Sequence, residues 1–299
     1  MAAALIVCDW GSTNLRAWTL DAGGDVVGHW AAPWGVNGLA PGEAPRRFDE
    51  VRANLGGRDL PALLCGAIGS NIGWRAIPYV DCPAGLSEVA SGVAEVALGV
   101  FIAPGLRCGG LGGAGDVLRG EETKALGWLQ LTPTSRRGRR LVCQPGTHPK
   151  WMLIEDGHIV RFQSAFTGEL FAVLSAHSIL RNDGAGADTV SFDEGLAAAG
   201  EGDALLNRLY GARSRVAGMG ASPATTGAYL SGLLIGAEVA ATPGLLGLEG
   251  EPVTVLAEEP LRGWYVRALT RRGAAVEVAD GEPAARAGLV AIARERGLL

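Results

Sequence analysis

The sequence predicts an α/β protein with two domains, each built on a mixed sheet flanked by helices. Its 299 residues are enough for two domains of ordinary size. A strand, a glycine-bearing turn and a hairpin open the chain, and the same order returns near its middle before alternating helices and strands. We therefore expect domains over residues 1–139 and 140–299, with a ligand cleft between them.

The first half opens with three predicted strands. Leu5–Asp9 is an apolar run, whereas Leu15–Leu20 and Val26–Trp30 alternate in polarity on either side of an Asp-Ala-Gly-Gly-Asp turn. Apolar runs and stretches of good helix formers follow. The other elements expected in this half are a helix over Glu43–Leu55, strands over Leu60–Ile68 and Val100–Ala103, and a helix over Asp116–Leu129 with Val117 facing inward.

The second half begins in the same way, with a short strand over Leu141–Gln144. Asp156-Gly157 predicts a hairpin between strands at Trp151–Glu155 and His158–Gln163. Thr167 is the expected N-cap of a helix that runs to Leu180 with Ile179 on its inner face. The remaining elements are a largely helical stretch to about Ala241, strands over Val253–Ala257 and Ala275–Ala279, and helices over Leu261–Arg272 and Glu282–Arg296.

Composition argues against several classes of function. The formal charge of −5 disfavours a nucleic-acid partner, which needs clustered Lys and Arg. No apolar run reaches the length of about 18–20 residues that crosses a bilayer. The five cysteines are odd in number and never form C-x-x-C, which is typical of reduced thiols and not of a zinc site. We expect a cytoplasmic protein without membrane or nucleic-acid partners, and homo-oligomerisation is left open.

The most informative segment is the turn after the first strand. Asp9 ends that strand, and a glycine and two hydroxyl residues lead directly into the next one. Gly11 permits close backbone approach to a phosphate, and Ser12 and Thr13 can donate hydrogen bonds to its oxygens. Asp9 can hold Mg²⁺, which neutralises both the carboxylate and the phosphate. The alternative is a plain hairpin in which Ser12, Thr13 and Asn14 only form the turn.

A second turn of this kind begins the second half. Gly146 and Thr147 stand between two short strands, so they can bind the same phosphates from the other domain. Lys150 can add positive charge near the terminal phosphate, or can simply be exposed. His148 can donate a hydrogen bond, or only complete the turn. Two such turns at matching places predict a nucleotide site more specifically than either turn alone.

Asp9-Trp10-Gly11-Ser12-Thr13-Asn14 resembles the first phosphate motif of the hexokinase, actin and heat-shock-70 ATPase superfamily, and Gly146-Thr147 resembles its second. Over nearly its whole length the chain is similar to the 2-dehydro-3-deoxygalactonokinase family. The similar segments are residues 9–18, 65–74, 78–79, 116–123, 145–151, 167–171 and 229–236.

This resemblance implies two actin-like (ribonuclease H-like) domains with the active site in the interdomain cleft. It also implies that ATP, with Mg²⁺, phosphorylates the 6-hydroxyl of 2-dehydro-3-deoxy-D-galactonate in galactonate breakdown. One segment departs from the superfamily pattern. Ala257 stands where the adenosine motif usually has glycine, and Glu258 and Glu259 add negative charge after it. Ala257 is still the expected adenosine contact.

Phosphoryl transfer requires positioning, charge neutralisation and a carboxylate that accepts the hydroxyl proton. Asp116 and Glu121 are the two candidates for this catalytic base. If Asp116 opens a helix it would cap that helix, and Arg119 would lie one turn further on. Both carboxylates could instead serve only the helix terminus, whose dipole favours negative charge. Related phosphatases carry a catalytic glutamate in a similar stretch, which favours Glu121 by analogy only.

The implied acceptor is an anion with several hydroxyl groups, so its pocket should offer arginine, amide and hydroxyl groups. Arg119 can pair with the acceptor carboxylate through two hydrogen bonds. The other predicted substrate-binding residues are Arg16, Ser70, Asn71 and Trp74, with Arg75, Asn14 and Asn37 as weaker candidates. For Trp10, Trp18 and Trp151 core packing is the preferred interpretation.

Two other functions on the same fold remain open. A nucleotide or polyphosphate phosphohydrolase would use water as the acceptor, which the Asp9 turn allows. A non-catalytic sugar-acid sensor would bind without turnover, but such a sensor usually carries a DNA-binding segment, and no basic helix-turn-helix precedes Leu5. The chain also lacks G-x-x-x-x-G-K-[ST]. A kinase is therefore the preferred hypothesis.

Overall fold

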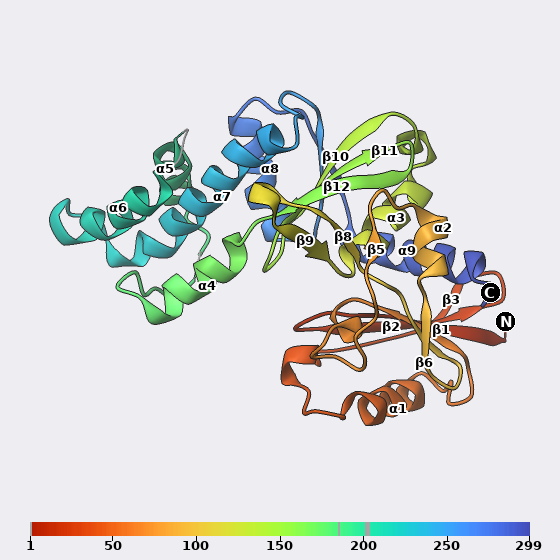
Figure 1. Ribbon diagram of the computed structural model, residues 1–299. Coiled ribbons are helices and arrows are strands. Elements are labelled where there is room, and N and C mark those ends of the chain that lie inside the picture. The colour runs from red at the N-terminus through yellow and green to blue at the C-terminus, as the bar shows by residue number, and fades with distance from the viewer. Residues whose placement is uncertain (1, 185, 201–203) are drawn as a thin grey trace. The chain divides into compact units, whose positions relative to one another are not determined.

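The computed structural model describes residues 2–184, 186–200 and 204–299 (Figure 1). Its contacts group the chain into two units, and both combine strands with helices, which confirms the predicted α/β class. Unit 1 comprises Met1–Arg139, Ile154–Arg161 and Asp280–Leu299, and unit 2 comprises Arg140–Leu153 and Phe162–Ala279. The C-terminal segment thus groups with unit 1, although the sequence analysis assigned it to the second domain. The division into domains 1–139 and 140–299 stays a prediction.

The main sheet of unit 1 has six strands. They are β1 (Ala3–Trp10), β2 (Leu15–Asp21), β3 (Val26–Ala32), β4 (Ala62–Cys65), β6 (Ala94–Ala97) and β7 (Val100–Ile102). Their order is β3-β2-β1-β4-β7-β6, and the three predicted opening strands are confirmed. β1 runs antiparallel to β2 and parallel to β4, so Asp9 lies opposite Arg16 on one side and Cys65 on the other.

A smaller sheet of unit 1 corrects one prediction. It contains β5 (Val80–Asp81), β8 (Leu106–Gly109) and β9 (Gly115–Leu118) in the order β5-β8-β9. Asp116 lies on β9 opposite Cys108, so it neither opens nor caps a helix. The predicted helix begins only at Glu121, because Gly120 has a φ of 102°, which interrupts helical backbone geometry. Val117, predicted to face inward, is exposed on the strand.

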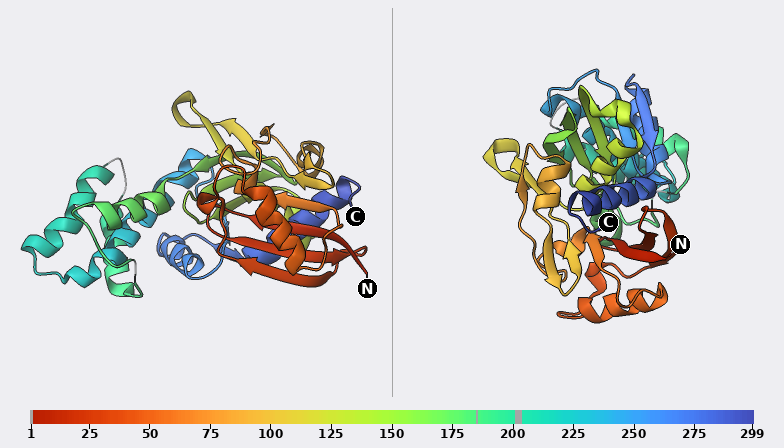
Figure 2. Two further views of the ribbon diagram at one scale, coloured as in Figure 1. Left: turned by 90° about the horizontal axis from the view of Figure 1, so that it is seen from below. Right: turned by 90° about the vertical axis from the view of Figure 1, so that its right-hand side faces the viewer.

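Four helices with described bounds belong to unit 1, namely α1 (Ala44–Asn54), α2 (Leu86–Ser91), α3 (Glu121–Leu131) and α9 (Gly281–Glu295). α9 packs against α3 and also contacts β1, so the two ends of the chain meet (Figure 2). The α3–α9 contact is a backbone contact. A Cβ on Gly127 would lie 1.8 Å from the Ala284 carbonyl oxygen, and one on Gly288 would lie 1.9 Å from that of Thr123.

A five-stranded sheet, most of whose residues belong to unit 2, has the order β12-β11-β10-β13-β14. Its strands are β10 (Arg139–Gln144), β11 (Lys150–Glu155), β12 (His158–Ser164), β13 (Val253–Leu256) and β14 (Val276–Ala279). The predicted Asp156-Gly157 hairpin is confirmed, and both residues have positive φ, as that turn requires.

Trp10, Trp18 and Trp151 are buried, which confirms that they belong to the core.

The helices of unit 2 are α4 (Thr167–His177), α5 (Thr189–Ala199), α6 (Leu205–Gly218), α7 (Thr226–Leu245) and α8 (Leu261–Arg271). Helices α4 to α7 form one cluster in which α7 contacts the other three (Figure 1). α4 ends before the predicted Leu180, and Ile179 is exposed. Thr167 is not the N-cap, because Phe166 precedes the first turn and the Thr167 side chain hydrogen-bonds to Glu238.

One helix among the described residues, Pro223–Leu245, is long and apolar enough to span a membrane by length and composition alone. The sequence analysis expected no such segment. However, 67% of its most apolar window is buried inside the protein, and glycines let it approach α5 closely. A Cβ on Gly232 would lie 2.0 Å from the Phe192 carbonyl oxygen. The apolar length of this helix is therefore accounted for by packing within unit 2.

Candidate active site

The turn after β1 is held by backbone hydrogen bonds. The Gly11 amide donates to the Asn14 carbonyl oxygen at 2.9 Å, which closes the turn. The amides of Val36 and Asn37 then donate to the carbonyl oxygens of Gly11 and Ser12, each at 3.1 Å. The segment after β3 thus supports the turn from one side. The carbonyl groups point toward this support, and the Thr13 and Asn14 side chains remain exposed.

Gly35 makes this support possible. A Cβ on Gly35 would lie 2.1 Å from the Ser12 carbonyl oxygen and 2.2 Å from the Thr13 Cα, so no other residue fits without moving the turn. A pocket of about 310 Å³ opens beside it. Its lining residues are Ser12, Thr13, Pro33, Trp34, Gly35, Asn37, Gly38, Leu39 and Arg47. A ligand in this pocket would therefore touch the two hydroxyl residues of the predicted phosphate turn.

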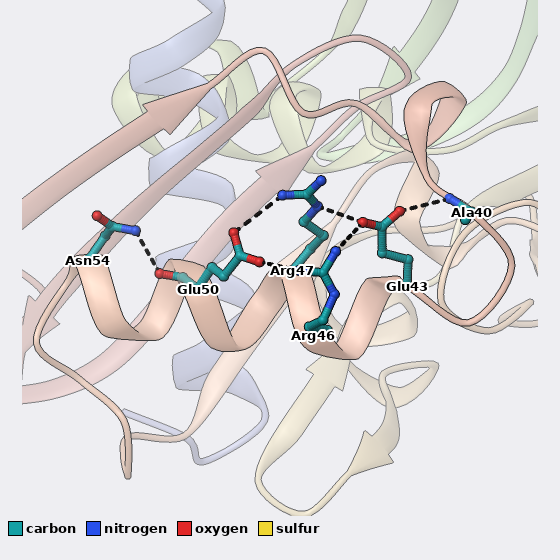
Figure 3. Close-up of polar contacts among 6 residues, drawn as sticks. All are labelled: Ala40, Glu43, Arg46, Arg47, Glu50 and Asn54. Carbon is teal, nitrogen blue, oxygen red and sulfur yellow. Dashed lines mark hydrogen bonds and ion pairs between the residues drawn. The ribbon is translucent and has the colours of Figure 1, made fainter.

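Arg47, which the sequence analysis missed, is fixed on α1 by a network of ion pairs (Figure 3). Its Nε lies 2.9 Å from Glu43 Oε1, its Nη1 lies 3.3 Å from Glu50 Oε2, and its guanidinium lies over the Trp34 ring. Arg46 pairs with the same two glutamates but does not line the pocket. The adjacent arginines Arg46 and Arg47 were a signal in the sequence for an anion-binding residue. Only the packing of Arg47 against Trp34 distinguishes it from Arg46.

Asp9 lies at the end of β1 with 8% of its surface exposed. Its Oδ2 is 3.5 Å from Lys124 Nζ, and the Cys65 thiol lies 3.9 Å from its Oδ1. No cluster of three or more metal-ligating side chains occurs among the described residues. Mg²⁺ nevertheless commonly binds through one or two carboxylates together with water and substrate phosphates. A single carboxylate beside a phosphate-type turn fits that donor set.

The first turn of α3 brings further charges to this position. The positive charge of Lys124 is favoured above all by Asp9 and also by Glu121, so the pKa of Lys124 is raised. Glu121 also accepts a hydrogen bond from the Arg119 amide at 2.9 Å. Asp116, the other predicted base, instead accepts a hydrogen bond from the Val117 amide at 2.7 Å. The electrostatic interactions of Lys124 therefore link Glu121 with Asp9.

Glu122 is fully buried next to this cluster. Its carboxylate accepts hydrogen bonds from the Gly120 amide at 2.6 Å and from the Thr123 hydroxyl at 2.8 Å. Burial, with a smaller contribution from Glu121, raises the pKa of Glu122 to about 7. Because it is buried, Glu122 is suited to hold the loop before α3 and not to contact a substrate.

The main predicted substrate-binding residues do not line the pocket at Ser12. Arg16 pairs with Glu282 on α9 at 3.4 Å. Arg119 donates to the Ile77 carbonyl oxygen at 2.6 Å and lies over the Tyr79 ring, while its Nε and Nη1 are buried with no hydrogen-bond partner among the described residues. These unsatisfied donors suit an anion, but neither arginine lines the pocket at Ser12.

The loop after β4 contains the other candidates. The Ser70 hydroxyl is buried and also lacks a partner within the described parts of the chain. Asn71 is exposed, and Arg75 donates to the Glu95 carbonyl oxygen. Trp74 packs against Phe48, with ring centroids 5.8 Å apart. Trp74 therefore packs against the hydrophobic core.

The second turn belongs to unit 2. α4 begins against it, and a Cβ on Gly168 would lie 2.4 Å from the Gly146 carbonyl oxygen. Thr147 is exposed, whereas the His148 ring approaches Glu169 to 2.5 Å and stacks on Phe166. Lys150 was predicted either to serve phosphate or to be exposed.

The alternative that Lys150 is exposed is wrong, because Lys150 is buried. Its Nζ donates to the Ser164 hydroxyl at 2.7 Å. Ala257, the predicted adenosine contact, follows β13 and is 7% exposed. Glu259, next to it, pairs with Arg262 and accepts a hydrogen bond from the Gly263 amide. At least one of the two neighbouring glutamates thus has a local partner within unit 2.

Mixed sheets with flanking helices form the fold that is expected of actin-like ATPases and sugar kinases. In agreement, the activator of 2-hydroxyisocaproyl-CoA dehydratase from Clostridium difficile, solved with bound ADPNP, aligns with a TM-score of 0.52 over 99% of this chain and 96% of that one. At 13% identity this likeness shows the fold alone.

The chain belongs to the family described as 2-keto-3-deoxy-galactonokinase, whose sequence profile matches residues 9–292. It is 33% identical to the 2-dehydro-3-deoxygalactonokinase of Escherichia coli (strain K12), over 98% of each chain. A crystal structure from Sinorhizobium meliloti, described under the same enzyme name, aligns with a TM-score of 0.85 at 31% identity, over 97% of this chain and 98% of that one. The protein is therefore a kinase that acts on a sugar acid.

Proposed function

We propose that this protein transfers the γ-phosphoryl group of ATP, with Mg²⁺, to the 6-hydroxyl of 2-dehydro-3-deoxy-D-galactonate. The observation that carries the proposal is that one pocket is lined by both hydroxyl residues of the turn after Asp9. An acceptor in that pocket would lie next to bound phosphate, as in-line transfer requires. The names of the relatives support the choice of substrate. None of the five cysteines forms a disulfide within the described residues, which suits the expected cytoplasmic location.

Each residue of the turn has a proposed role. Asp9 would hold Mg²⁺, which when bound neutralises phosphate charge. Ser12 and Thr13 would donate hydroxyl hydrogen bonds to phosphate or acceptor, and Gly11 would allow close approach. Asn14 would add an amide, although its Nδ2 already donates to the Thr13 hydroxyl at 3.1 Å.

Glu121 is the proposed base that accepts the proton of the acceptor hydroxyl. Its interaction with Lys124, which lies 3.5 Å from Asp9, supports this choice. Asp116 is on β9 and is the second choice. A carboxylate near the reacting hydroxyl would take up its proton as the new P–O bond forms.

On unit 2, we assign Gly146, Thr147 and Lys150 to the phosphates of ATP and Ala257 to its adenosine. Thr147 is exposed, and no heavy atom of the described residues lies within 4 Å of the Cβ position of Gly146, which supports a role for this turn in binding. His148 is engaged by Glu169 and Phe166, which supports a role in forming the turn.

The test is an assay of ADP release with 2-keto-3-deoxy sugar acids and with ordinary hexoses. We expect ADP release only with a sugar-acid acceptor, and phosphorus NMR of the product should show coupling to the two C6 protons. ADP release of equal rate without any acceptor would identify a phosphohydrolase instead. Binding of the sugar acid without turnover would identify a sensor.

The assignment of the base is tested with Glu121→Gln and Asp116→Asn assayed side by side. Removal of a general base typically lowers turnover about 100- to 10,000-fold. We expect that loss for Glu121→Gln and a smaller one for Asp116→Asn. The reverse order would assign the role to Asp116, and full activity of both variants would exclude this part of the chain.

A further inference from the structure

Lysine is rare in this protein and occurs at only two positions, one of which, Lys150, was predicted to serve phosphate. Of the 26 Lys and Arg residues, two are lysines, Lys124 and Lys150, and all others are arginines. Lys150 follows the second turn, and Lys124 lies in the first turn of α3 beside Asp9. Arginine forms the surface ion pairs, such as those of Arg46 with Glu50 and of Arg107 with Asp81. The lysine at position 124 therefore calls for a specific explanation.

The setting of Lys124 differs from that of a surface lysine. Its Nζ lies 3.5 Å from Asp9 Oδ2, and its side chain is 29% exposed while that of Asp9 is 9% exposed. The carboxylate is thus mostly shielded, and Lys124 is its charged partner. The exposed part of the side chain leaves room for the ammonium group to reach a ligand. An ammonium group has three rotatable donors, so it can satisfy one carboxylate and still donate elsewhere.

We propose that Lys124 is a phosphate-binding residue that neutralises Asp9 when no metal is bound and donates to the terminal phosphate oxygens of the nucleotide. This inference rests on the proposed function, because it takes the Asp9 turn as the phosphate site. Without Lys124 the Asp9 carboxylate would repel a nucleotide that arrives without metal. With Lys124 the carboxylate is neutralised and the ammonium group offers N–H donors to the phosphate tail, and a divalent cation and the ammonium group compete for the same carboxylate.

Binding measurements without turnover test the proposal. Nucleotide binding by calorimetry in the presence of a chelator reports the metal-free site, and Mn²⁺ binding to the nucleotide-free protein, by electron paramagnetic resonance, reports access to Asp9. For Lys124→Gln we expect metal-free ATP affinity to fall about 10- to 100-fold, the usual effect of losing a charge-assisted hydrogen bond. Mn²⁺ affinity should instead rise, because its competitor at Asp9 is gone.

Two further variants keep the test decisive. Arg46→Gln removes the same charge from unit 1 at a side chain that is 62% exposed, and it should leave both affinities unchanged. Lys124→Arg retains the charge and should keep most of the metal-free ATP binding of the wild type. This variant still tests the role of the charge if thermal melting shows that Lys124→Gln is unstable. Unchanged ATP and Mn²⁺ affinities in folded Lys124→Gln would overturn the role of Lys124. A wild-type protein that binds no ATP even with Mg²⁺ would overturn the proposed function itself.

Discussion

Gly66 and Gly120 face each other so closely that a Cβ on Gly120 would lie 2.9 Å from the Cα of Gly66. Gly66 in turn lies against β1, since its own Cβ would be 2.7 Å from the Trp10 carbonyl oxygen and 3.3 Å from Asp9 Oδ1. This contact of three backbone segments brings the start of α3, and with it Lys124, to the end of β1.

Gly120→Ala should therefore be strongly destabilising. The φ of 102° strains any L-residue, and the methyl group would also collide with the Gly66 backbone. We expect a loss of about 2–4 kcal/mol in the free energy of unfolding, measured with urea. Gly112→Ala is the matched control, because Gly112 has a φ of 64° but no heavy atom of the described residues within 4 Å of its Cβ position. Equal losses for both variants would contradict the importance of the Gly66 contact.

Gly127→Ala should weaken the packing of α3 on α9. In an open helix position this substitution usually stabilises by up to about 1 kcal/mol. At Gly127 the methyl group would overlap the Ala284 carbonyl, so we expect a loss of about 1–3 kcal/mol instead. Gly218 lies at the end of α6 with no heavy atom in the described part of the chain within 4 Å of its Cβ position, so Gly218→Ala should show no such loss. Thermal or urea unfolding of the two variants measures whether each substitution lowers or raises the free energy of unfolding.

Asp9→Asn should reduce turnover by at least about 100-fold, since it removes the carboxylate assigned to Mg²⁺ while conserving shape. The change in melting temperature should be modest, because asparagine still fills the space. Steady-state kinetics at several Mg²⁺ concentrations, with thermal melting as the control, measures both effects. Near-normal turnover in this variant would remove Asp9 from the proposed metal role.

Glu122 should make stability depend on pH. Its pKa rises from the ordinary 4.5 to about 7 on folding, so the native state keeps a proton that the unfolded chain has lost. Stability contributed by this group therefore falls as the pH rises through that window, by about 3 kcal/mol in total. Glu122→Gln should remove this dependence and be the more stable protein at about pH 8. Parallel pH profiles of the two proteins in urea unfolding would refute the prediction.

Arg47→Met should raise the KM for the sugar acid about tenfold, because a guanidinium that lines the pocket at Ser12 is lost. The turnover number should change less, since Arg47 is not assigned to the reacting hydroxyl. Arg46→Met breaks ion pairs with the same two glutamates but leaves the pocket lining intact, so its KM should remain close to that of the wild type. A similar KM in both variants would exclude Arg47 from acceptor binding.

Local patterns in the sequence were sufficient to predict most strands and helices. The apolar run that ends at Asp9 and the Asp156-Gly157 hairpin depend on neighbouring residues only, and both appear as predicted. The prediction failed where a local pattern was ambiguous. The predicted helix over Asp116–Leu129 started too early, because Asp116 pairs with Cys108 in a sheet and the run of good helix formers begins only at Glu121.

The sequence by itself determined the alternation of strands and helices, the family and the glycine–hydroxyl turn after Asp9, because all of these are written in short contiguous segments. Only the tertiary structure decided that Lys124 is the partner of Asp9, that Arg47 and not Arg46 lines the pocket, and that α9 belongs with unit 1. These pairings depend on how closely distant backbones approach one another. That approach is set by glycines such as Gly66 and Gly127, whose neighbours in space cannot be read from their neighbours in the chain.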